Sequence, residues 1–457
     1  MEFNTVDICV VGHTNAGKTS LLRTLLRQKD FGVVAAMPST TRDVVGTETK
    51  APSAKTLKWH DTPGLEESRE LYDVMRNGTP EDLKHDGPGQ VNYFLQQEKL
   101  VTRFSQESKV LKQLMQSHAA LVVIDTRSSV LEKLLDELSI LKLSGIPLIP
   151  VLNFSTIKDD VKRWEEALRK MSIHNFVVFD TVRTPPSAEE ELFEQLASVL
   201  PKFKEDFKAH LEYRRQAQVS RVSESLLHVA DLIAEVGTLY EIAEKNKQSS
   251  IQTELEKQVQ SFESKYTLKI LDIFGFTASD ARLAALPMMK GHWDDNVFDP
   301  STWSKFGKSV AATTATGGAV GLSIDVMTGG LSLGLGTLIG GALGVAYESA
   351  GAFGERVKAK IAGKQLFTVD KAVLEIITTR AMLLINALQK RGLAAQQSVE
   401  IEFDQQLDLS PLSGSYRTLK RNLNWSKEDL ELRLVRDKYN AWRTKFQESL
   451  HTVMKEM

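Results

Sequence analysis

The 457-residue sequence contains very little cysteine and carries almost no net charge. Its single cysteine, Cys9, lies within the apolar run Val6–Val11 and is expected to be a small buried side chain. One cysteine excludes a fold held by intrachain disulfides and fits a reducing compartment. The formal net charge of −2 also argues against nucleic acid as a partner held by bulk electrostatics.

The sequence has no charged and apolar leader before its first strand-like run, which starts at Thr5. We therefore expect a cytoplasmic protein. Hydrophobic residues (42%) and charged residues (25%) are balanced as in folded proteins, and the length exceeds what one hydrophobic core supports. Two or more domains are expected.

Proline is absent from residues 202–286, where only two glycines interrupt a helical pattern. Apolar residues recur there at alternating spacings of four and three, which predicts a long packed helix. This apolar seam comprises Val222, Leu226, Val229, Ile233, Val236 and Tyr240. It has two interpretations: it packs inside its own domain, which we favour, or it joins two copies of the chain into a homo-oligomer.

Strand-like and helix-like patterns alternate through about the first 200 residues. Short continuous apolar runs separated by amphipathic helices are typical of a parallel sheet that is covered on both faces. The runs are Val6–Val11, Ala120–Asp125, Ile146–Leu152 and Phe176–Phe179. The sequence thus predicts a doubly wound, mainly parallel α/β domain that closes with a helix over Ala188–Leu200 and Pro201.

The first apolar run leads into Gly12–Thr19, with the sequence GHTNAGKT, and a helical pattern follows over Ser20–Arg27. This order is the P-loop pattern, in which backbone N–H groups surround the β-phosphate of a nucleotide. Lys18 is expected to reach the β- and γ-phosphates, and the Thr19 hydroxyl to ligate Mg²⁺. The predicted nucleotide-binding residues of this segment are Asn15, Ala16, Gly17, Lys18, Thr19 and Ser20.

A second motif, Asp61-Thr62-Pro63-Gly64, follows the strand-like run Leu57–His60, 43 residues after Lys18. An aspartate at this place can hold the magnesium ion through water, and the Gly64 N–H can sense the γ-phosphate. Between the two motifs, residues 38–43 (PSTTRD) supply a threonine that can close over the metal when the γ-phosphate is present. The sequence therefore predicts a nucleotide-dependent switch.

The motifs GHTNAGKT, STTRD and DTPG, in this order and spacing, resemble the Era-like branch of the translation-factor-related GTPases, which includes tRNA-modification and ribosome-assembly GTPases. The resemblance covers about residues 1–200. The whole chain resembles bacterial proteins in which such a domain precedes a helical C-terminal domain of unknown function. GTP and GDP are therefore the implied ligands.

The resemblance also implies roles for individual residues. The implied catalytic residues are Lys18, Thr41 and Gly64, and the implied magnesium ligands are Thr19, Thr41 and Asp61. Thr40 is the alternative to Thr41 in switch I. Asn15 matches a P-loop asparagine that in some relatives helps to coordinate a catalytic potassium ion, so potassium activation is a hypothesis.

Leu65 follows Gly64 at the position where Ras-type enzymes carry the glutamine that orients water. A leucine cannot orient water, so hydrolysis needs another polar group, a monovalent cation or a partner. Glu66, Glu67 and Glu70 are candidates by proximity in the sequence. Acidic residues on such a helix are more often a solvated surface.

The base-recognition motif departs from the family pattern N/T-K-x-D. Asn153 is present and is the predicted base contact, but the lysine and the aspartate are replaced in Asn153-Phe154-Ser155-Thr156. Substitutes follow at Lys158, Asp159 and Asp160, although acids at a helix start have a capping role of their own. The next loop reads Asp180-Thr181-Val182 where the family has Ser-Ala-Lys. The choice between guanine and adenine stays open.

Residues 309–347 hold ten glycines and one charged residue, Asp325. The glycines fall at intervals of four, which favours a tight helical hairpin. Basic residues on both flanks would keep both ends on the cytoplasmic side of a membrane. Partial insertion into a membrane is one interpretation, and a buried glycine-packed hairpin within the C-terminal domain is the other.

We therefore predict four parts: a P-loop GTPase-like domain (1–201), a first helical part (202–300), the glycine-rich hairpin (301–360) and a second helical part (361–457). Within the last part, Thr368 is the expected N-cap of a helix ending near Gly392, and residues 426–457 form another helix. The leading hypothesis is a slow, Mg²⁺-dependent GTPase switch that acts through a helical region at the inner face of a membrane or on a membrane protein. The alternative is a membrane-associated scaffold that binds nucleotide, with ATP not excluded, and hardly hydrolyses it.

Overall fold

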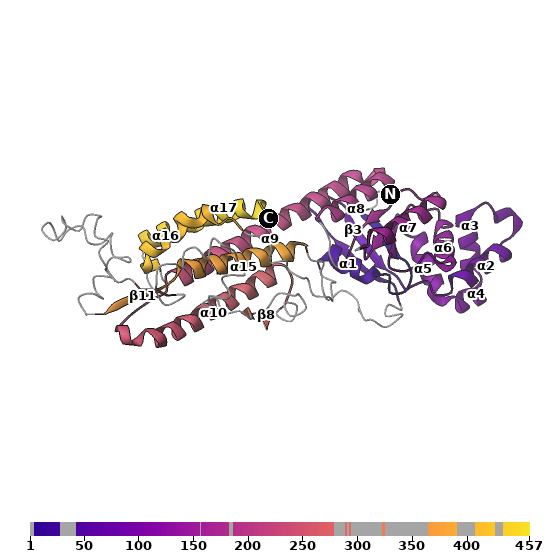
Figure 1. Cartoon of the computed structure of the whole chain (residues 1–457). Coiled ribbons are helices and arrows are strands. Elements are labelled where there is room, and N and C mark those ends of the chain that lie inside the picture. The colour runs from indigo at the N-terminus through magenta and orange to yellow at the C-terminus, as the bar shows by residue number, and fades with distance from the viewer. Residues whose placement is uncertain are drawn as a thin grey trace. The chain divides into compact units, whose positions relative to one another are not determined.

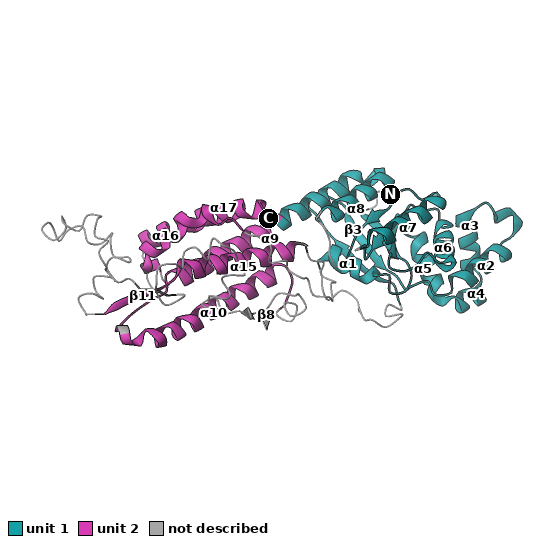
Figure 2. Ribbon diagram, in the orientation of Figure 1, with its two compact units in different colours: residues 1–218, 390–397 teal, residues 219–389, 398–457 magenta. Residues whose placement is uncertain are grey.

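The computed structural model describes residues 4–27, 43–155, 157–181, 186–277, 288–289, 292–293, 322–324, 364–390, 407–425 and 433–457. The chain divides into two compact units (Figure 2). Unit 1 comprises residues 1–218 and 390–397, and unit 2 comprises residues 219–389 and 398–457. The division falls inside helix α9 (Lys204–Gly237), whereas the sequence placed a domain boundary at residue 201.

Unit 1 contains a six-stranded sheet in the order β2-β3-β1-β4-β5-β6. All neighbouring pairs are parallel except β2 and β3. The strands are β1 (Thr5–Val11), β2 (Val45–Thr49), β3 (Thr56–Asp61), β4 (Ala119–Asp125), β5 (Leu148–Asn153) and β6 (Val177–Val178). The prediction of a mainly parallel sheet is confirmed. Strand β2 was missed because it is a short antiparallel edge strand with mostly polar, exposed residues.

Helices cover both faces of this sheet (Figure 1). One face packs on α1 (Lys18–Leu26), α8 (Pro186–Val199) and the start of α9, after η2 (Pro201–Phe203). The other face packs on α2 (Ser68–Gly78), α3 (Gly87–Leu95), α5 (Ser105–Met115), α6 (Glu132–Lys142) and α7 (Lys158–Lys170). Cys9 belongs to this second core and is fully buried, as predicted, and burial raises the pKa of its thiol.

A helical segment of residues 68–115 separates β3 from β4. It begins with α2 and continues through η1 (Glu81–Leu83), α3, α4 (Glu98–Arg103) and α5. Its apolar side chains, including Val91, Phe94 and Leu111, fill the core beside α2 and α6. The segment therefore braces the region that follows the DTPG motif.

Unit 2 is mainly helical, as predicted. Its helices within the described residues are the second part of α9, α10 (Gln248–Ile273), α15 (Lys371–Lys390), α16 (Ser413–Arg421) and α17 (Arg433–Lys455). Short 3-10 turns are η3 (Lys245–Lys247), η6 (Ser410–Leu412) and η7 (Leu423–Trp425). The small sheets are β10-β11-β7 and β8-β9, from β7 (Tyr240–Ala243), β8 (Met288–Met289), β9 (His292–Trp293), β10 (Leu322–Ile324) and β11 (Gln365–Val369).

Polar contacts join the helices of unit 2 across their apolar core. Arg443 of α17 pairs with both carboxylate oxygens of Asp231 on α9. Arg380 of α15 pairs with Glu263 of α10, and both side chains are almost fully buried. Charges taken out of water to this extent need their partner to offset the cost of desolvation. The Arg380–Glu263 pair therefore holds α15 against α10, and the partly exposed Arg443–Asp231 pair joins α17 to α9.

The predicted apolar seam lies on α9, where Val222, Leu226, Val229, Ile233 and Val236 are all buried within the single chain. The long packed helix is confirmed, and this burial supports the intramolecular interpretation over oligomerisation. The last seam residue, Tyr240, lies beyond the helix in β7.

The predicted N-cap at Thr368 is wrong. Thr368 lies in strand β11, and Asp370 caps helix α15 by accepting a hydrogen bond from the backbone N–H of Ala372 at 3.0 Å. Strand pairing with β7 through Thr368 and with β10 through Val369 keeps the backbone extended and leaves the next polar residue to begin the helix. Of the glycine-rich segment the structure describes Leu322–Ile324, which form β10 rather than helix; the rest of residues 301–360 lies outside the described residues.

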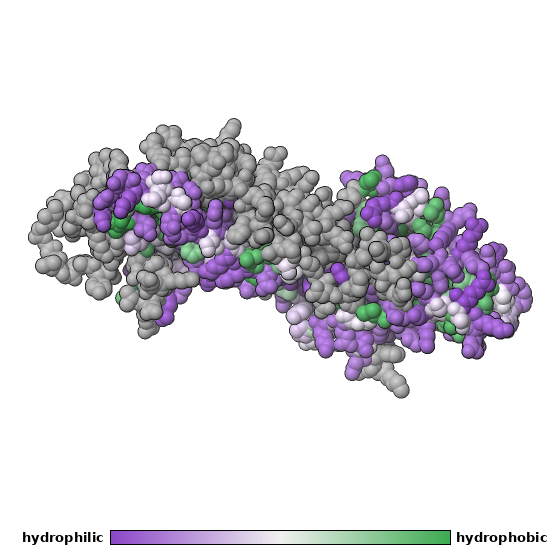
Figure 3. All heavy atoms as spheres, turned by 90° about the horizontal axis from the view of Figure 1, so that it is seen from below, coloured by the Kyte–Doolittle hydropathy of each residue, from purple (hydrophilic) through white to green (hydrophobic). Residues whose placement is uncertain are grey.

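Among the described residues, one helix segment, Lys371–Gln389, has the length and composition to cross a membrane. Within the structure 83% of it is buried, as expected for the core helix of unit 2. Figure 3 shows the described surface of one face as mainly hydrophilic, with hydrophobic residues in small separate patches.

Candidate nucleotide-binding site

The predicted site residues come together at one edge of the sheet in unit 1. The P-loop follows β1, Asp61 ends β3 and Asn153 ends β5, and these strands run in the same direction. Loops at the carboxyl ends of parallel strands share one edge, where doubly wound folds bind ligands. Thr40 and Thr41 of the predicted switch I lie outside the described residues.

The P-loop backbone adopts conformations that require its glycines. Gly12 has φ 140° and Gly17 has φ 98°, and Asn15 between them also has a positive φ of 64°. A Cβ atom on Gly12 would lie 2.3 Å from the backbone oxygen of Val123, and one on Gly17 would lie 2.3 Å from Asn153 Nδ2. The loop therefore passes close to β4 and β5 and turns into α1 at Lys18.

Helix α1 places the N-terminal N–H groups of Lys18, Thr19 and Ser20 at the loop. The first N–H groups of a helix have no acceptor within it, and their dipoles favour an anion. No side chain caps this terminus at Gly17 in the described part of unit 1. This geometry suits the phosphate groups of a nucleotide.

Lys18 lies across the loop that carries it. Its Nζ donates to the backbone oxygens of Gly12 and His13, each at 2.9 Å, and its side chain is buried. Burial lowers the pKa of the Lys18 ammonium. The carboxylates of Asp61, Glu137 and Glu66 act against this shift. A bound polyphosphate would supply the negative charge that the buried ammonium lacks.

Thr19 and Asp61 form the predicted metal site. The Thr19 hydroxyl donates to Asp61 Oδ2 at 2.6 Å, and both residues are buried. The other carboxylate oxygen, Oδ1, is buried and has no hydrogen-bond partner among the described residues. Burial also raises the pKa of Asp61, which its hydrogen bond from Thr19 opposes. A hydroxyl beside a carboxylate with a spare oxygen matches the hard oxygen ligands of Mg²⁺, so the residues fit this ion.

The DTPG segment is held against the P-loop. The Thr62 hydroxyl donates to the backbone oxygen of Val10 at 2.8 Å. A Cβ atom on Gly64 would lie 2.3 Å from Thr14 Oγ1, so only glycine lets the two loops approach so closely. Leu65 is fully buried in the core beneath α2. Its side chain therefore faces away from solvent as well as lacking polar atoms.

Two acidic residues join this segment to its surroundings. Thr14 of the P-loop donates to Glu66 Oε1 at 3.1 Å. Glu107 of α5 is buried and accepts the backbone N–H groups of Glu66 at 3.1 Å and Glu67 at 3.0 Å. Glu107 thereby satisfies N–H groups at the start of helix α2.

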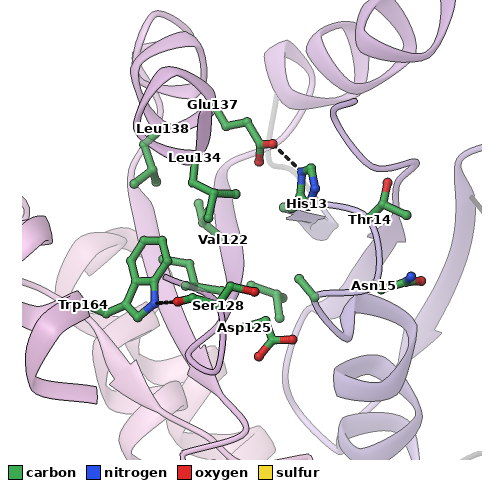
Figure 4. Close-up of a pocket in the computed structure, with 14 residues that line it drawn as sticks. His13, Thr14, Asn15, Val122, Asp125, Ser128, Leu134, Glu137, Leu138 and Trp164 are labelled. Carbon is green, nitrogen blue, oxygen red and sulfur yellow. Dashed lines mark hydrogen bonds and ion pairs between the residues drawn. The ribbon is translucent and has the colours of Figure 1, made fainter. Parts of the chain in front are cut away.

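Another acidic residue, Glu137 of α6, contacts the P-loop through His13. Glu137 Oε1 lies 2.6 Å from His13 Nδ1, and Figure 4 shows the two side chains facing each other while Thr14 and Asn15 project to the other side of the loop. Burial raises the pKa of Glu137, and its hydrogen bond with His13 opposes the shift. A cavity of about 180 Å³ adjoins this pair, with Leu134, Leu138 and Trp164 among its lining residues.

Asn153 joins three loops through its amide. Its Nδ2 donates to the backbone oxygen of Ala16 at 2.9 Å. Its Oδ1 accepts the N–H groups of Phe154 at 2.9 Å and Thr181 at 3.0 Å. The side chain is fully buried. Asn153 thus holds the P-loop to the loops after β5 and β6, and its role as a base contact stays a prediction.

An aromatic residue occupies the position of the expected lysine. Phe154 has a positive φ of 57°, and the guanidinium of Arg127 lies 3.8 Å from the centre of its ring. Arg127 in turn forms a bidentate pair with Asp125 at 2.9 and 2.7 Å. The acids proposed as substitutes lie in the first turn of α7, which fits their helix-start role.

Sequence reasoning missed Glu107, Glu137 and the Arg127–Phe154 contact. Glu107 lies 41 residues from Glu66, and Glu137 lies 124 residues from His13. No local pattern marks such acids, because their function depends on which loops the fold brings to them.

Residues 165–452, well over half of the chain, match a family described as a domain of unknown function (DUF3482). The chain belongs to the DUF3482 family. Residues 7–154 match a second family, described as 50S ribosome-binding GTPase. This DUF3482 protein therefore joins an Era/TrmE-like P-loop GTPase domain to its C-terminal region, and the predicted resemblance is confirmed.

The tRNA modification GTPase MnmE of Geotalea uraniireducens is 27% identical over 174 residues, which cover 38% of this chain and 35% of that protein. The chain thus matches about a third of this relative's length. Among solved structures, Era from Aquifex aeolicus is 16% identical, with 60% of this chain and 100% of that chain covered and a TM-score of 0.31. The G domain of the T. maritima FeoB iron transporter is 21% identical, with 43% and 98% covered and a TM-score of 0.25.

Proposed function

We propose that this DUF3482 protein is a molecular switch that binds GTP with Mg²⁺, hydrolyses it slowly and passes its nucleotide state to the helical unit. One observation carries the proposal. The buried Lys18 ammonium bonds the P-loop carbonyls and interacts electrostatically with Asp61 of the Thr19–Asp61 pair, so a phosphate group and a divalent cation would have their protein partners side by side. When bound, the ion would neutralise charge that develops on the phosphates.

Slow turnover is proposed because the position that carries glutamine in Ras-type enzymes holds a leucine that is buried in the core. Positioning of water and charge neutralisation dominate phosphoryl transfer, and this domain lacks that means of positioning. Potassium bound near Asn15 is the proposed activator. Turnover of purified protein in potassium against sodium buffer tests this point, and equal rates would contradict it.

The binding proposal is tested by nucleotide titration with fluorescent GTP and ATP analogues in the presence of Mg²⁺. We expect micromolar or tighter binding of the guanine nucleotide, and a loss of about 100-fold or more in the Lys18→Ala variant. Lys142→Ala is the matched control, since Lys142 lies at the end of α6 and bonds the backbone oxygen of Met171. Equal binding by the Lys18→Ala variant would refute the site, and preference for ATP would refute its guanine selectivity.

Coupling to the helical unit is proposed through α9, which is continuous across the division between the units. Within unit 1, Glu189 of α8 lies 3.0 Å from Arg27, at the end of α1, and 3.1 Å from Arg214 on α9. Arg214 also bonds the backbone oxygen of Leu25. The helix that begins at the phosphate site is thereby fastened to the helix that enters unit 2.

Helix α9 also holds the turn between β2 and β3, which connects the two switch segments. Asp206 accepts the backbone N–H of Lys55 at 2.8 Å, and His210 Nε2 lies 2.8 Å from the backbone oxygen of the same residue. A shift of β3 with the metal ligand Asp61 would therefore act on α9 at two points. This arrangement supports the proposed transmission.

Hydrogen exchange of the full chain tests the coupling. We expect peptides of α10 and α15 to change their exchange between the GDP and GTP-analogue states, and this change to disappear in Glu189→Ala with nucleotide affinity retained. Glu194→Ala, an exposed acid of the same helix, is the matched control. Identical exchange of unit 2 in both nucleotide states of the wild-type protein would contradict the coupling.

Membrane association is a further part of the proposal, and it rests on the sequence of the glycine-rich segment 309–347 with its basic flanks. Co-sedimentation with vesicles of anionic phospholipid should be strong for the wild-type protein and sensitive to nucleotide. It should fall in Leu338→Arg, because a cation in an apolar membrane segment costs about 3 kcal/mol. Vesicle binding without measurable turnover would favour a membrane-associated scaffold over a switch.

A further inference from the structure

We propose that Glu66 is the general base that orients the attacking water and takes up its proton, a role that the glutamine of Ras-type enzymes does not fill, and that Glu107 positions Glu66 for this task. The proposal rests on the proposed GTPase function and names two residues of its site. The sequence offered Glu66 only as one of three candidate acids, and it gave no indication of Glu107, which lies in a different helix.

Glu66 is the acid of the α2 start that reaches the P-loop. Its Oε1 accepts the Thr14 hydroxyl at 3.1 Å, and Thr14 lies against Gly64, whose N–H is expected to meet the γ-phosphate. Glu66 is also close enough to Lys18 for its charge to act on the ammonium that should bind the same phosphate. A carboxylate here lies beside the expected place of the γ-phosphate and is exposed to water.

The neighbouring acids do not share this arrangement. Glu70 forms an ion pair with Arg103 of α4, which draws it toward the helical segment. Glu67 is exposed, and its backbone N–H rather than its side chain makes the contact with Glu107. Of the three candidate acids, Glu66 is therefore the one whose side chain contacts the P-loop.

Glu107 fixes the backbone from which Glu66 projects. It is buried, 3% exposed, and its Oε1 accepts two successive N–H groups, those of Glu66 and Glu67. Two hydrogen bonds to a charged acceptor each contribute more than neutral ones and define the direction of the peptide. The same helix, α5, pairs Lys109 with Asp43 at 2.5 Å, so it contacts both the last residue of the predicted switch I segment (38–43) and the start of switch II.

The proposed step is a simple hydrolysis. A water molecule donates a hydrogen bond to the Glu66 carboxylate, and its oxygen forms a bond to the γ-phosphorus. The bond from that phosphorus to the β,γ-bridging oxygen breaks, and its electron pair leaves with GDP. The proton of the water passes to Glu66 and then to the released inorganic phosphate, which restores the carboxylate.

Single-turnover hydrolysis of GTP, together with the dissociation constant for GDP, tests the role of Glu66. We expect Glu66→Ala to lower the rate by about 100-fold and to leave GDP affinity within about threefold. Glu66→Gln should also be slow, because an amide cannot take up the proton. The matched control is Glu67→Gln, which keeps the backbone contact with Glu107 and should hydrolyse GTP like the wild-type protein.

Rescue by a conservative change tests the role of Glu107. Glu107→Gln keeps an oxygen that accepts both N–H groups and should retain most of the rate. Glu107→Ala leaves two N–H groups without this acceptor and should lower the rate by about tenfold with GDP affinity preserved. Equal loss in both variants would show that the charge, rather than the positioning contact, is needed and would overturn this part.

The outcomes separate the inference from the function on which it rests. If the wild-type protein hydrolyses GTP and Glu66→Ala does so at the same rate, the assignment of Glu66 is wrong while the GTPase function stands. A Glu66→Ala protein that loses GDP binding in parallel would also overturn it, because the residue would then serve binding. Absence of GTP turnover in the wild-type protein, with and without potassium, would overturn the proposed function itself.

Discussion

Thr19 and Asp61 lie 42 residues apart in the sequence and share a hydrogen bond of 2.6 Å at the carboxyl edge of the sheet. The second oxygen of Asp61 is buried without a hydrogen-bond partner among the described residues. A buried carboxylate oxygen in this condition is costly unless a ligand uses it. Thr19 follows β1 through the P-loop and Asp61 ends β3, so the site can form only because β1 and β3 are neighbours in the sheet.

The first prediction concerns this metal site. Asp61→Asn should lower the affinity for GTP in the presence of Mg²⁺ by about 10- to 100-fold, since an amide is a weaker partner for the ion and its water shell. With the metal removed by chelator, the wild-type and variant proteins should bind with similar affinity. Titration of a fluorescent nucleotide with and without chelator measures both values, and an unchanged affinity in Mg²⁺ would contradict the assignment.

The second prediction concerns the close approach of the P-loop to β4. Gly12→Ala should destabilise unit 1 by about 2 kcal/mol or more, because its Cβ would meet the backbone oxygen of Val123 at 2.3 Å and the residue has φ 140°. Gly78→Ala is the matched control at the end of α2, where a Cβ meets nothing within 4 Å. Hydrogen exchange of peptides from β1 should show faster opening only in Gly12→Ala.

The third prediction separates the two halves of the Asn153 amide. Asn153→Asp keeps the acceptor for the N–H of Thr181 but loses the donor to Ala16. Asn153→Asp should weaken nucleotide binding more than Asn153→Gly does, because the aspartate also places a buried charge against the backbone oxygen of Ala16. In thermal unfolding, both variants should have a lower midpoint temperature than the wild-type protein. A wild-type midpoint in Asn153→Asp would refute the structural role of the amide.

The fourth prediction is a pH dependence of unit 1. Burial lowers the pKa of His210 from its ordinary value of 6.5, the bond to the Lys55 oxygen and the charge of Asp206 oppose this, and the charge of Arg214 adds to it. The unfolded chain therefore binds a proton at a higher pH than the folded one. The contribution of neutral His210 to the free energy of unfolding is fully present above pH 6.5. It is lost as the pH falls through the lower pKa that His210 has in the folded protein.

His210→Gln should remove this part of the pH dependence, since glutamine does not titrate and its amide can donate to the Lys55 oxygen. Calorimetry of the full chain between pH 5 and pH 8 measures the effect. We expect the midpoint temperature for the thermal unfolding of unit 1 to fall less steeply on acidification in the variant than in the wild-type protein. Parallel curves for the two proteins would show that His210 does not contribute.

Much of unit 1 was predictable because its signals are local. Continuous apolar runs gave four of the strands, and glycine and lysine spacing gave the P-loop, since backbone conformation and helix start depend on neighbouring residues. Strand β2 was not predictable in the same way, because its polar residues pair with β3 at a sheet edge. Thr368 was misplaced because pairing with β7 overrode its capping preference.

The sequence by itself determined the phosphate loop, the order of strand and helix around it and the absence of a polar residue at Leu65. Tertiary structure alone decided that Asn153 joins three loops, that Leu65 is buried and that Glu66 meets Thr14 while Glu107 holds its backbone. The physical reason is the distance along the chain over which each interaction acts. Glycine conformations and helix starts depend on adjacent residues, whereas a carboxylate acquires its role from partners that only the folded sheet and its covering helices bring within hydrogen-bond distance.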